Sequence, residues 1–190
     1  MKNTIIKPKE GIRKIFEYDI SKFKNYVSSL EESEWLKWTE RQTPNSNHQH
    51  TQSIKIQWIP LNVSFYEKEK TEYIEPYYSS VNQFLNPLIN FLEKHYSGKI
   101  YKIILVRLKP FSEIKAHVDS SFSLTHTHRN HIPILTNDKV FFSCSNNIQN
   151  MKEGSVYEID NLSTHWVRNE SEWPRTHLII DVIENTQLMI

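Results

Sequence analysis

Histidines and nearby carboxylates are concentrated in the C-terminal half of the sequence. Six of the nine histidines lie between positions 117 and 177. His117 and Asp119 are two positions apart, so on a β-strand both side chains would point to the same face. His165 follows on a later segment. Two imidazoles and one carboxylate on one face of a metal leave its other positions open, which is the ligand set of non-haem iron oxygenases. These three residues are therefore candidate Fe(II) ligands.

Basic residues close to these candidate ligands could bind an organic acid. Arg175 follows His165 after the segment 170–174, and a guanidinium can hold a carboxylate through two parallel hydrogen bonds. A hairpin centred near Glu172 would pair His165 with about position 179 and place Arg175 roughly 13 Å along the strand from the metal. That span suits a five-carbon diacid that chelates the metal at one end and is held by Arg175 at the other. Arg129 and His131 share a strand face and could bind the metal-proximal carboxylate.

Each of these residues also has a simpler interpretation. His117 could be a solvated histidine, Asp119 could form a turn, and Arg175 could cap a strand end. Zinc also binds two histidines and a carboxylate, which would suit a hydrolase. His126 and His128 would fit structural zinc or an ordinary polar loop and strand edge.

The segment 41–52 is polar and has no periodicity, which predicts a loop. His48 and His50 in this loop could bind a metal, but no third ligand stands nearby, so an exposed loop is the simpler interpretation. If the loop moves, it is a candidate lid over the substrate.

The hydrophobic pattern predicts helices before strands. Helices are expected at 21–30 and 78–96, with Pro87 either kinking the second helix or starting a new one. A strand is expected near 54–59. After Gly98 the pattern changes to short strands, at about 100–108, 113–119, 129–135, 139–143, 155–160, 164–168 and 176–183. Such closely spaced strands indicate a β-sandwich or barrel with an α-helical N-terminal part.

The overall composition limits the classes of protein to consider. A chain of 190 residues with 38% hydrophobic residues is expected to form a single globular domain. A net charge of +1 gives no bulk attraction to nucleic acid or membranes. The single cysteine, Cys144, fits a reducing compartment, and no apolar run has the length of a signal peptide or membrane span. The sequence thus predicts a cytoplasmic protein; it does not indicate an oligomeric state.

Residues 100–184 resemble the aspartyl/asparaginyl β-hydroxylase family of 2-oxoglutarate- and Fe(II)-dependent oxygenases, which includes bacterial free-proline hydroxylases. The resemblance rests on five motifs, in order and at family spacing: His117-x-Asp119, Arg129-x-His131-Ile132-Pro133-Ile134, Gly154 to Asp160, His165-x-Val167-x-Asn169 and Arg175-x-His177-Leu178-Ile179-x-Asp181. Some animal members lack the carboxylate ligand, so Asp119 makes the chain similar to the bacterial branch. Pro110-Phe111-Ser112 departs from the small residues usual before the first motif.

The resemblance implies a double-stranded β-helix, formed here by residues 99–184, with residues 1–98 supporting and covering it. It implies Fe(II) on His117, Asp119 and His165. It also implies 2-oxoglutarate on Arg175, helped by Arg129 and His131, with O₂ as the second cosubstrate.

The activity expected from this resemblance is hydroxylation of an unactivated C–H bond, with succinate and CO₂ as coproducts. The small, nearly neutral chain favours an amino-acid-like substrate. The alternatives are a peptide or protein side chain, a carrier-bound intermediate, or a non-catalytic or zinc-binding barrel. Aromatic residues are candidate pocket walls, although most such residues belong to ordinary cores: Trp58, Tyr77, Tyr78, Trp166 and Trp173. Asp160 and Asn169 are candidates for supporting the ligating histidines.

Overall fold

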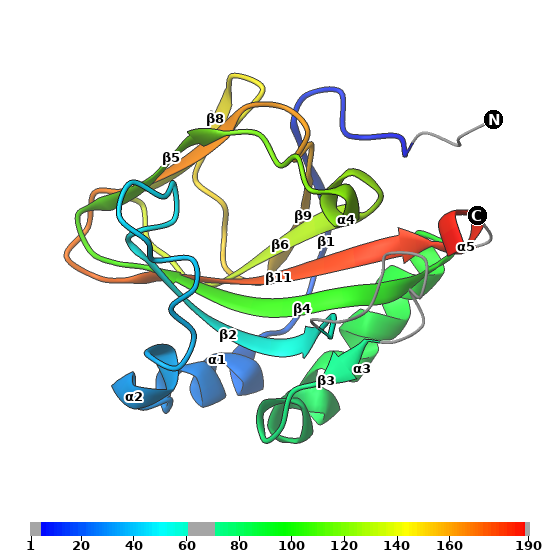
Figure 1. The fold of residues 1–190 in the computed structure, drawn as a ribbon, viewed down its shortest axis with the longest axis horizontal. Coiled ribbons are helices and arrows are strands. Elements are labelled where there is room, and N and C mark those ends of the chain that lie inside the picture. The colour runs from blue at the N-terminus through cyan, green and yellow to red at the C-terminus, as the bar shows by residue number, and fades with distance from the viewer. Residues whose placement is uncertain (1–4, 61–70, 189–190) are drawn as a thin grey trace.

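Two antiparallel β-sheets face each other in the computed structural model, which describes residues 5–60 and 71–188 (Figure 1). The larger sheet runs, in spatial order, β1 (Ile12–Glu17), β9 (Ser155–Ile159), β6 (His128–Leu135), β11 (Arg175–Glu184), β4 (Gly98–Leu108), β2 (Thr51–Trp58) and β3 (Glu72–Tyr73). The smaller sheet runs β5 (Ser112–His117), β10 (His165–Asn169), β7 (Val140–Cys144) and β8 (Asn147–Gln149). This arrangement confirms the predicted mainly β, jelly-roll architecture.

Helices α1 (Ser21–Ser28) and α3 (Tyr77–His95) cover the outer face of the larger sheet (Figure 1). Three shorter helices complete the described elements: α2 (Glu32–Trp35), α4 (Phe122–Thr125) and α5 (Asn185–Leu188). In α3, Val81, Leu85, Leu88 and Leu92 form the buried stripe. Pro87 lies inside one continuous helix, so no second helix starts there. No helix in the described part of the chain has both the length and the apolar character needed to cross a membrane.

Successive residues along the strands of the larger sheet alternate between the face covered by the helices and the inner face, which points toward the smaller sheet. On β11, Leu178, Ile180 and Val182 pack in the cluster beneath the helices. Ile179 has the opposite orientation and packs with residues on the inner face. Successive strand residues point to opposite faces, so His177 and Asp181 share the inner face with Ile179. The same alternation turns Arg129 and His131 of β6 inward, because Ile132 and Ile134 belong to the helix side. A second apolar cluster, from both sheets, closes the space between them.

The first hundred residues contribute strands as well as helices to this framework. β1 pairs with β9 at one end of the larger sheet. β2 pairs with β4, the strand next to the central β11. Thr51 lies opposite Leu108, which in turn lies opposite Arg175. The loop before β2 therefore leaves the sheet at the level of Arg175.

The expected hairpin between the strands of His165 and Arg175 is wrong. β10 pairs with β5 and β7, which places His165 opposite His117 and Cys144. β11 pairs instead with β4 and β6 of the other sheet. Residues 170–174 thus carry the chain from one sheet to the other, so Arg175 faces His165 across the barrel and not along a strand.

Candidate active site

The three predicted metal ligands meet at one end of the smaller sheet. One ligand atom from each of His117, Asp119 and His165 lies within 4.8 Å of the others. His117 ends β5 and His165 begins β10, and direct pairing of the two strands sets their rings 4.2 Å apart between centroids. The backbone N–H of Asp119 donates to the carbonyl of Asn161 at 3.0 Å, which fixes the chain just after β5. The fold therefore brings together the donor set that sequence spacing predicted.

Hydrogen bonds to the backbone orient both imidazoles. Nδ1 of His117 lies 2.7 Å from the carbonyl oxygen of Lys115, and Nδ1 of His165 lies 2.9 Å from that of Ser163. A carbonyl only accepts hydrogen bonds, so Nδ1 carries the proton in each ring and Nε2 keeps its lone pair. Burial lowers the pKa of His165 and so favours its neutral form. Neutral imidazoles fixed in this way by a backbone carbonyl are suited to metal ligation.

Asp119 is held by a buried arginine that a second carboxylate supports. Nη1 of Arg129 donates to Asp119 Oδ2 at 2.9 Å, while its Nε and Nη2 donate to Asp181 at 2.9 and 2.8 Å. Burial by itself would raise the pKa of Asp119, but Arg129, His165 and His117 together outweigh it and lower that pKa below its ordinary value. Arg129 thus contacts two protein carboxylates, whereas it was expected to bind the metal-proximal carboxylate of a cosubstrate.

Arg175 lies on the inner face of the larger sheet with only 1% of its surface exposed. Its Nη2 approaches His177 Nδ1 at 2.5 Å, and its Nε is buried and has no hydrogen-bond partner within residues 5–60 and 71–188. Burial lowers the pKa of Arg175 to about 9, and no nearby carboxylate among the described residues offsets this effect. A buried guanidinium without a counter-charge is costly. The site therefore needs an anion at Arg175.

His131 and His177 lie beside this guanidinium. Their rings are 5.7 Å apart between centroids, and the Nε2 atom of each is buried without a partner. Burial, followed by the charge of Arg175, lowers the pKa of both imidazoles well below the ordinary value, so both rings are neutral at pH 7. Unpaired buried polar atoms on one inner face are what a bound polar molecule would satisfy.

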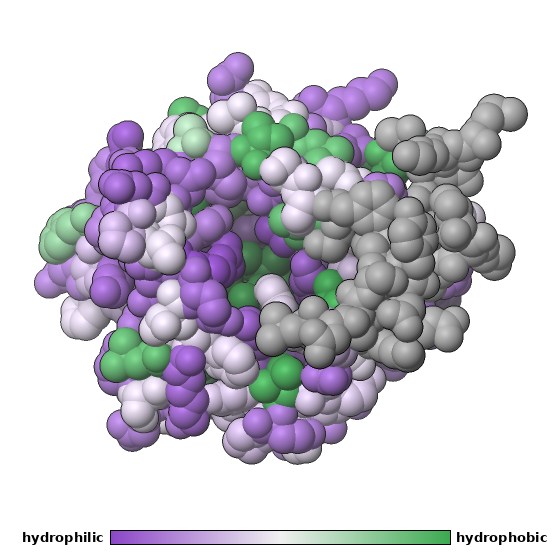
Figure 2. Space-filling model, viewed as in Figure 1, coloured by the Kyte–Doolittle hydropathy of each residue, from purple (hydrophilic) through white to green (hydrophobic). Residues whose placement is uncertain are grey.

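The loop before β2 covers the metal ligands. Arg41 and His48 line the same cavity as His117, Arg129, His131, His165 and Arg175. The ring of His48 packs edge-on against that of His117, with 5.0 Å between centroids. His48 is thus a neighbour of the metal group and not an exposed loop residue, whereas His50 is exposed as expected. In the view of Figure 2 the surface is hollowed near its centre, with hydrophobic residues in its depth and mainly hydrophilic ones around it.

The other predicted polar residues have supporting roles at most. Asp160 accepts from Ser163 Oγ at 2.6 Å and so fixes the turn whose carbonyl orients His165. Asn169 bonds the carbonyls of Lys109 and Trp173 and shapes the crossing between sheets, so it does not contact a metal ligand. His128 faces the helix side, where it bonds two glutamates, which removes it from a zinc site with His126.

The aromatic residues proposed as pocket walls do not line this cavity. Trp166 lies on the opposite face of β10 from His165, beneath the guanidinium of Arg168 at 5.4 Å. Trp58 packs against Ile104, Val106 and Ile179 further along the inner face. Tyr77 belongs to the helix-side core, and Trp173 is 65% exposed.

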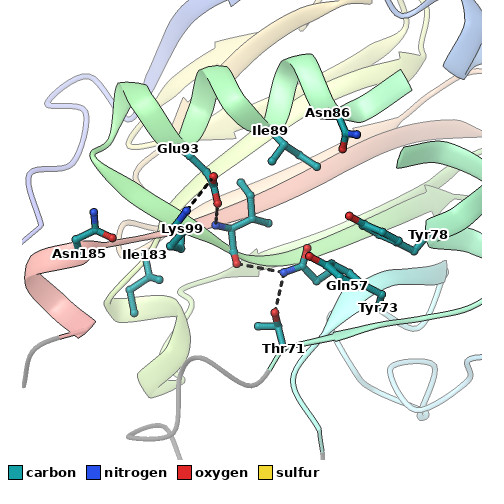
Figure 3. Close-up of a pocket in the computed structure, with 11 residues that line it drawn as sticks. Gln57, Thr71, Tyr73, Tyr78, Asn86, Ile89, Glu93, Lys99, Ile183 and Asn185 are labelled. Atoms are coloured by element: carbon teal, nitrogen blue, oxygen red, sulfur yellow. Dashed lines mark hydrogen bonds and ion pairs between the residues drawn. The ribbon is translucent and has the colours of Figure 1, made fainter. Parts of the chain in front are cut away.

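Tyr78 lines a different cavity, of about 600 Å³, between α3 and the ends of β4 and β11 (Figure 3). Its ring stacks on Tyr73 at 3.7 Å. Glu93 on the opposite wall bonds the backbone of Ile100 at 3.1 Å. This larger cavity contains none of the predicted site residues except Tyr78. Volume alone would therefore have indicated the wrong site.

Sequence reasoning gave no site role to three residues that surround the candidate site, namely Arg41, His177 and Asp181, and it preferred an exposed loop position for His48. His177 and Asp181 follow Arg175 at even intervals on one strand, so the period-two rule alone would have placed all three on one face. Arg41 and His48 come from an irregular loop, and no periodicity in the sequence brings them to the metal ligands.

Comparison with known proteins agrees with this geometry. Residues 24–185 match the family model described as aspartyl/asparaginyl beta-hydroxylase. No match was found among curated protein sequences. An oxidoreductase of the 2OG-Fe(II) oxygenase family from Burkholderia pseudomallei is similar in structure, with 12% identity, a TM-score of 0.61, and coverage of 92% of this chain and 85% of that one.

Two prolyl hydroxylase structures are similar at the level of the fold. One, from Trichoplax adhaerens in complex with a hypoxia inducible factor peptide, has 10% identity and a TM-score of 0.54 over 95% of this chain and 87% of that one. The other, from Pseudomonas putida, has 10% identity and a TM-score of 0.50 over 93% and 94% of the two chains.

The fold is that of the 2-oxoglutarate-dependent oxygenases. Because the family model matches most of its length, the chain belongs to the aspartyl/asparaginyl β-hydroxylase family and is a hydroxylase. The resemblance seen in five sequence motifs is thereby confirmed.

Proposed function

We propose that this hydroxylase uses Fe(II), 2-oxoglutarate and O₂ to hydroxylate a C–H bond of a small amino-acid-like substrate, releasing succinate and CO₂. The observation that carries the proposal is the convergence of His117, Asp119 and His165 within 4.8 Å, opposite an inward-facing arginine without a counter-ion. Two imidazoles and one carboxylate favour iron and leave positions open for other ligands. When bound, the iron and its cosubstrates supply the oxidising chemistry.

The protein's part in the reaction is positioning. His117 and His165 present Nε2 lone pairs because their Nδ1 protons are bonded to backbone carbonyls. Arg129 fixes the carboxylate of Asp119 through the hydrogen bond from Nη1 to Oδ2. The smaller sheet and the loop after β5 thus carry the metal half of the site.

The larger sheet carries the cosubstrate half. Arg175 binds the distal carboxylate of 2-oxoglutarate, which gives its buried charge a partner. His131 and His177 flank this anion with neutral imidazoles, whose unpaired Nε2 atoms are available for hydrogen bonds. The apolar walls include Val106, Phe142 and Ile179, which limit the access of water to the reacting groups.

A zinc hydrolase would use the same three ligands, but it would leave the buried charge of Arg175 without a role. A peptide or protein side chain, or a carrier-bound intermediate, remains the alternative substrate class. The same assay can distinguish these possibilities.

The test is succinate release from 2-oxoglutarate by the protein loaded anaerobically with Fe(II) and then exposed to O₂, across free amino acids and short peptides. We expect release that rises with a free amino acid and is lost in His117→Ala, while the exposed-histidine control His50→Ala retains it. Arg175→Lys should raise the KM for 2-oxoglutarate roughly 10- to 100-fold, since one bidentate charged contact is lost, whereas Arg168→Lys on the outer face should not. Tight zinc binding without 2-oxoglutarate consumption would refute the proposal.

A further inference from the structure

The loop 41–50 places at the candidate active site an arginine that is paired with no carboxylate among the described residues. Arg41 lines the cavity of the metal ligands and contacts His48 through Nη2···Nε2 at 3.1 Å. Burial, together with the neighbouring charge of Arg129, lowers the pKa of Arg41 to about 10. A guanidinium in this setting lacks the counter-charge that buried cations require.

The carboxylates near Arg41 are already bonded to other cations. Those that act on its charge are Asp119, Asp181 and Glu40. Arg129 bonds the two aspartates, and Lys55 bonds Glu40. Among the described residues, Arg41 therefore has no carboxylate of its own, although it lies in a site that brings three arginines together.

His48 offers a second donor at the same place. Because Arg41 can only donate, Nε2 of His48 accepts and the ring proton lies on Nδ1. That Nδ1 is buried and has no hydrogen-bond partner in the described part of the chain. A buried donor without an acceptor costs about 1–3 kcal/mol, so an acceptor supplied by a ligand would remove this cost.

The loop is built to hold these two donors in place. Successive turns link Gln42 to Thr39, Ser46 to Thr43 and Gln49 to Ser46 through backbone hydrogen bonds. The carbonyl of His48 accepts from both the N–H and the hydroxyl of Thr51, the first residue of β2. The position of His48 is thereby coupled to the larger sheet beside Arg175.

We propose that Arg41 and His48 bind the carboxylate of the substrate itself, so that the enzyme acts on a small free carboxylic acid such as an unblocked amino acid. This inference rests on the proposed function and specifies its substrate class. Each of the three arginines then binds a different carboxylate. Arg129 binds that of Asp119, Arg175 binds the distal carboxylate of 2-oxoglutarate, and Arg41 binds the carboxylate of the substrate. A substrate bound in this way lies beneath the loop, next to His117.

The experiment compares free amino acids with the corresponding amino acid amides, as substrates of the Fe(II)-loaded wild type, Arg41→Gln, Arg41→Lys and the outer-face control Arg168→Gln. Succinate release gives kcat and KM, and anaerobic equilibrium binding of the acid gives a second readout. For wild type we expect the acid to be preferred over its amide. In Arg41→Gln, KM and Kd for the acid should rise roughly 10- to 150-fold, as for loss of a charged hydrogen bond, so the acid–amide preference should collapse.

The remaining outcomes are equally decisive. Partial recovery of the preference in Arg41→Lys, with Arg168→Gln like wild type, would support a charge-specific contact and not a general loss of folding. Equal use of acids and amides by wild type, or stimulation by blocked peptides alone, would overturn the inference. So would an Arg41→Gln variant in which KM rises for 2-oxoglutarate and not for the acid. Absence of 2-oxoglutarate turnover in wild type would instead refute the proposed function.

Discussion

At the scale of single residues, Arg129 links two carboxylates, those of Asp119 and Asp181. It donates once to Asp119 and twice to Asp181, and it lies between the two sheets. Burial opposes the charge of Arg129, but Asp181 and Asp119 outweigh it and raise the pKa of the guanidinium. Asp181 can therefore influence the metal without contacting it.

The substitution Asp181→Asn tests this influence. Asparagine keeps the shape but removes the charge that holds Arg129, so the guanidinium should shift toward Asp119 and reduce the electron donation of that carboxylate. We expect Fe(II) affinity to fall roughly tenfold, in the range seen when groups that orient metal ligands are changed. Anaerobic Fe(II) titration measures this. The control is Glu184→Gln, which changes a half-exposed carboxylate on the same strand. Unchanged Fe(II) affinity in Asp181→Asn would contradict the influence of Asp181 on the metal.

At the scale of elements, β9 is tied to its two neighbours through one buried glutamate. Glu158 receives hydrogen bonds from His128 of β6 at 2.6 Å and from Arg13 of β1 at 2.5 Å. Burial would raise the pKa of Glu158, but the hydrogen bond and charge of His128, followed by those of Arg13, outweigh it and lower the pKa below the ordinary value. Glu158 thus stabilises the fold in its ionised form.

This depressed pKa sets the pH dependence of stability. Glu158 binds a proton more readily in the unfolded chain than in the native state. Its contribution to the free energy of unfolding is therefore complete above the ordinary glutamate pKa of about 4.3. That contribution is lost as the pH falls through the lower native pKa. Glu158→Gln should cost roughly 2–3 kcal/mol at pH 7, because the hydrogen bonds from His128 and Arg13 lose their charged acceptor.

Chemical denaturation at pH 7 and pH 3.5 measures the free energy of unfolding of Glu158→Gln and of wild type. The difference between these two free energies should be smaller at the lower pH. Glu184→Gln, at the partly exposed partner of His128, should cost less than about 1 kcal/mol. A Glu158→Gln deficit that is independent of pH would show that the charge is not what stabilises β9.

Element positions were the part of the structure that the sequence predicted well. Long apolar runs in the sequence indicate buried strands such as β4 and β11. A stripe of leucines and valine at helical spacing indicates α3. The three-residue β8 was missed because it is too short to show any period. Helix α3 ends at His95, within one residue of its predicted end. Gly98 starts β4, where an added Cβ would lie 2.2 Å from the carbonyl oxygen of Ile183, and Ser97 takes the positive φ of 48°.

The candidate site was predictable only in part, for a physical reason. The ligand trio and Arg175 are encoded as residue types at strand spacing, which a reader of the sequence can detect. Sheet membership depends on which strands pair over long separations, and no local pattern specifies it. Hence the hairpin between β10 and β11 was wrongly predicted. Arg41 and His48 were misplaced for a related reason, since no local pattern fixes where an irregular loop packs.

At the scale of the whole molecule, ligands of the site should join the two sheets. The metal ligands belong to the smaller sheet and the loop after β5, whereas Arg175 belongs to the larger one. A ligand that binds only the native state stabilises it by about 2.7 kcal/mol at 100 times its Kd. For a chain of this size that corresponds to a rise in Tm of roughly 5–10 °C.

Thermal unfolding under anaerobic conditions tests this prediction. Fe(II) and 2-oxoglutarate together should raise Tm more than either does alone, because only together do they connect both sheets. His117→Ala should abolish the rise, and His50→Ala should preserve it. Equal rises in both variants would show that the ligands bind elsewhere.

The distribution of the site over two sheets also has an evolutionary consequence. Changes around Arg175 on β11 can alter which organic acid is accepted, provided that Arg129 and Asp181 keep their hold on Asp119. Changes in the irregular loop before β2 can retune the substrate while both sheets keep their pairing. Metal binding, cosubstrate binding and substrate binding thus depend mainly on three separate stretches of chain, which are linked by the contacts of Arg129 with Asp119 and of His48 with His117.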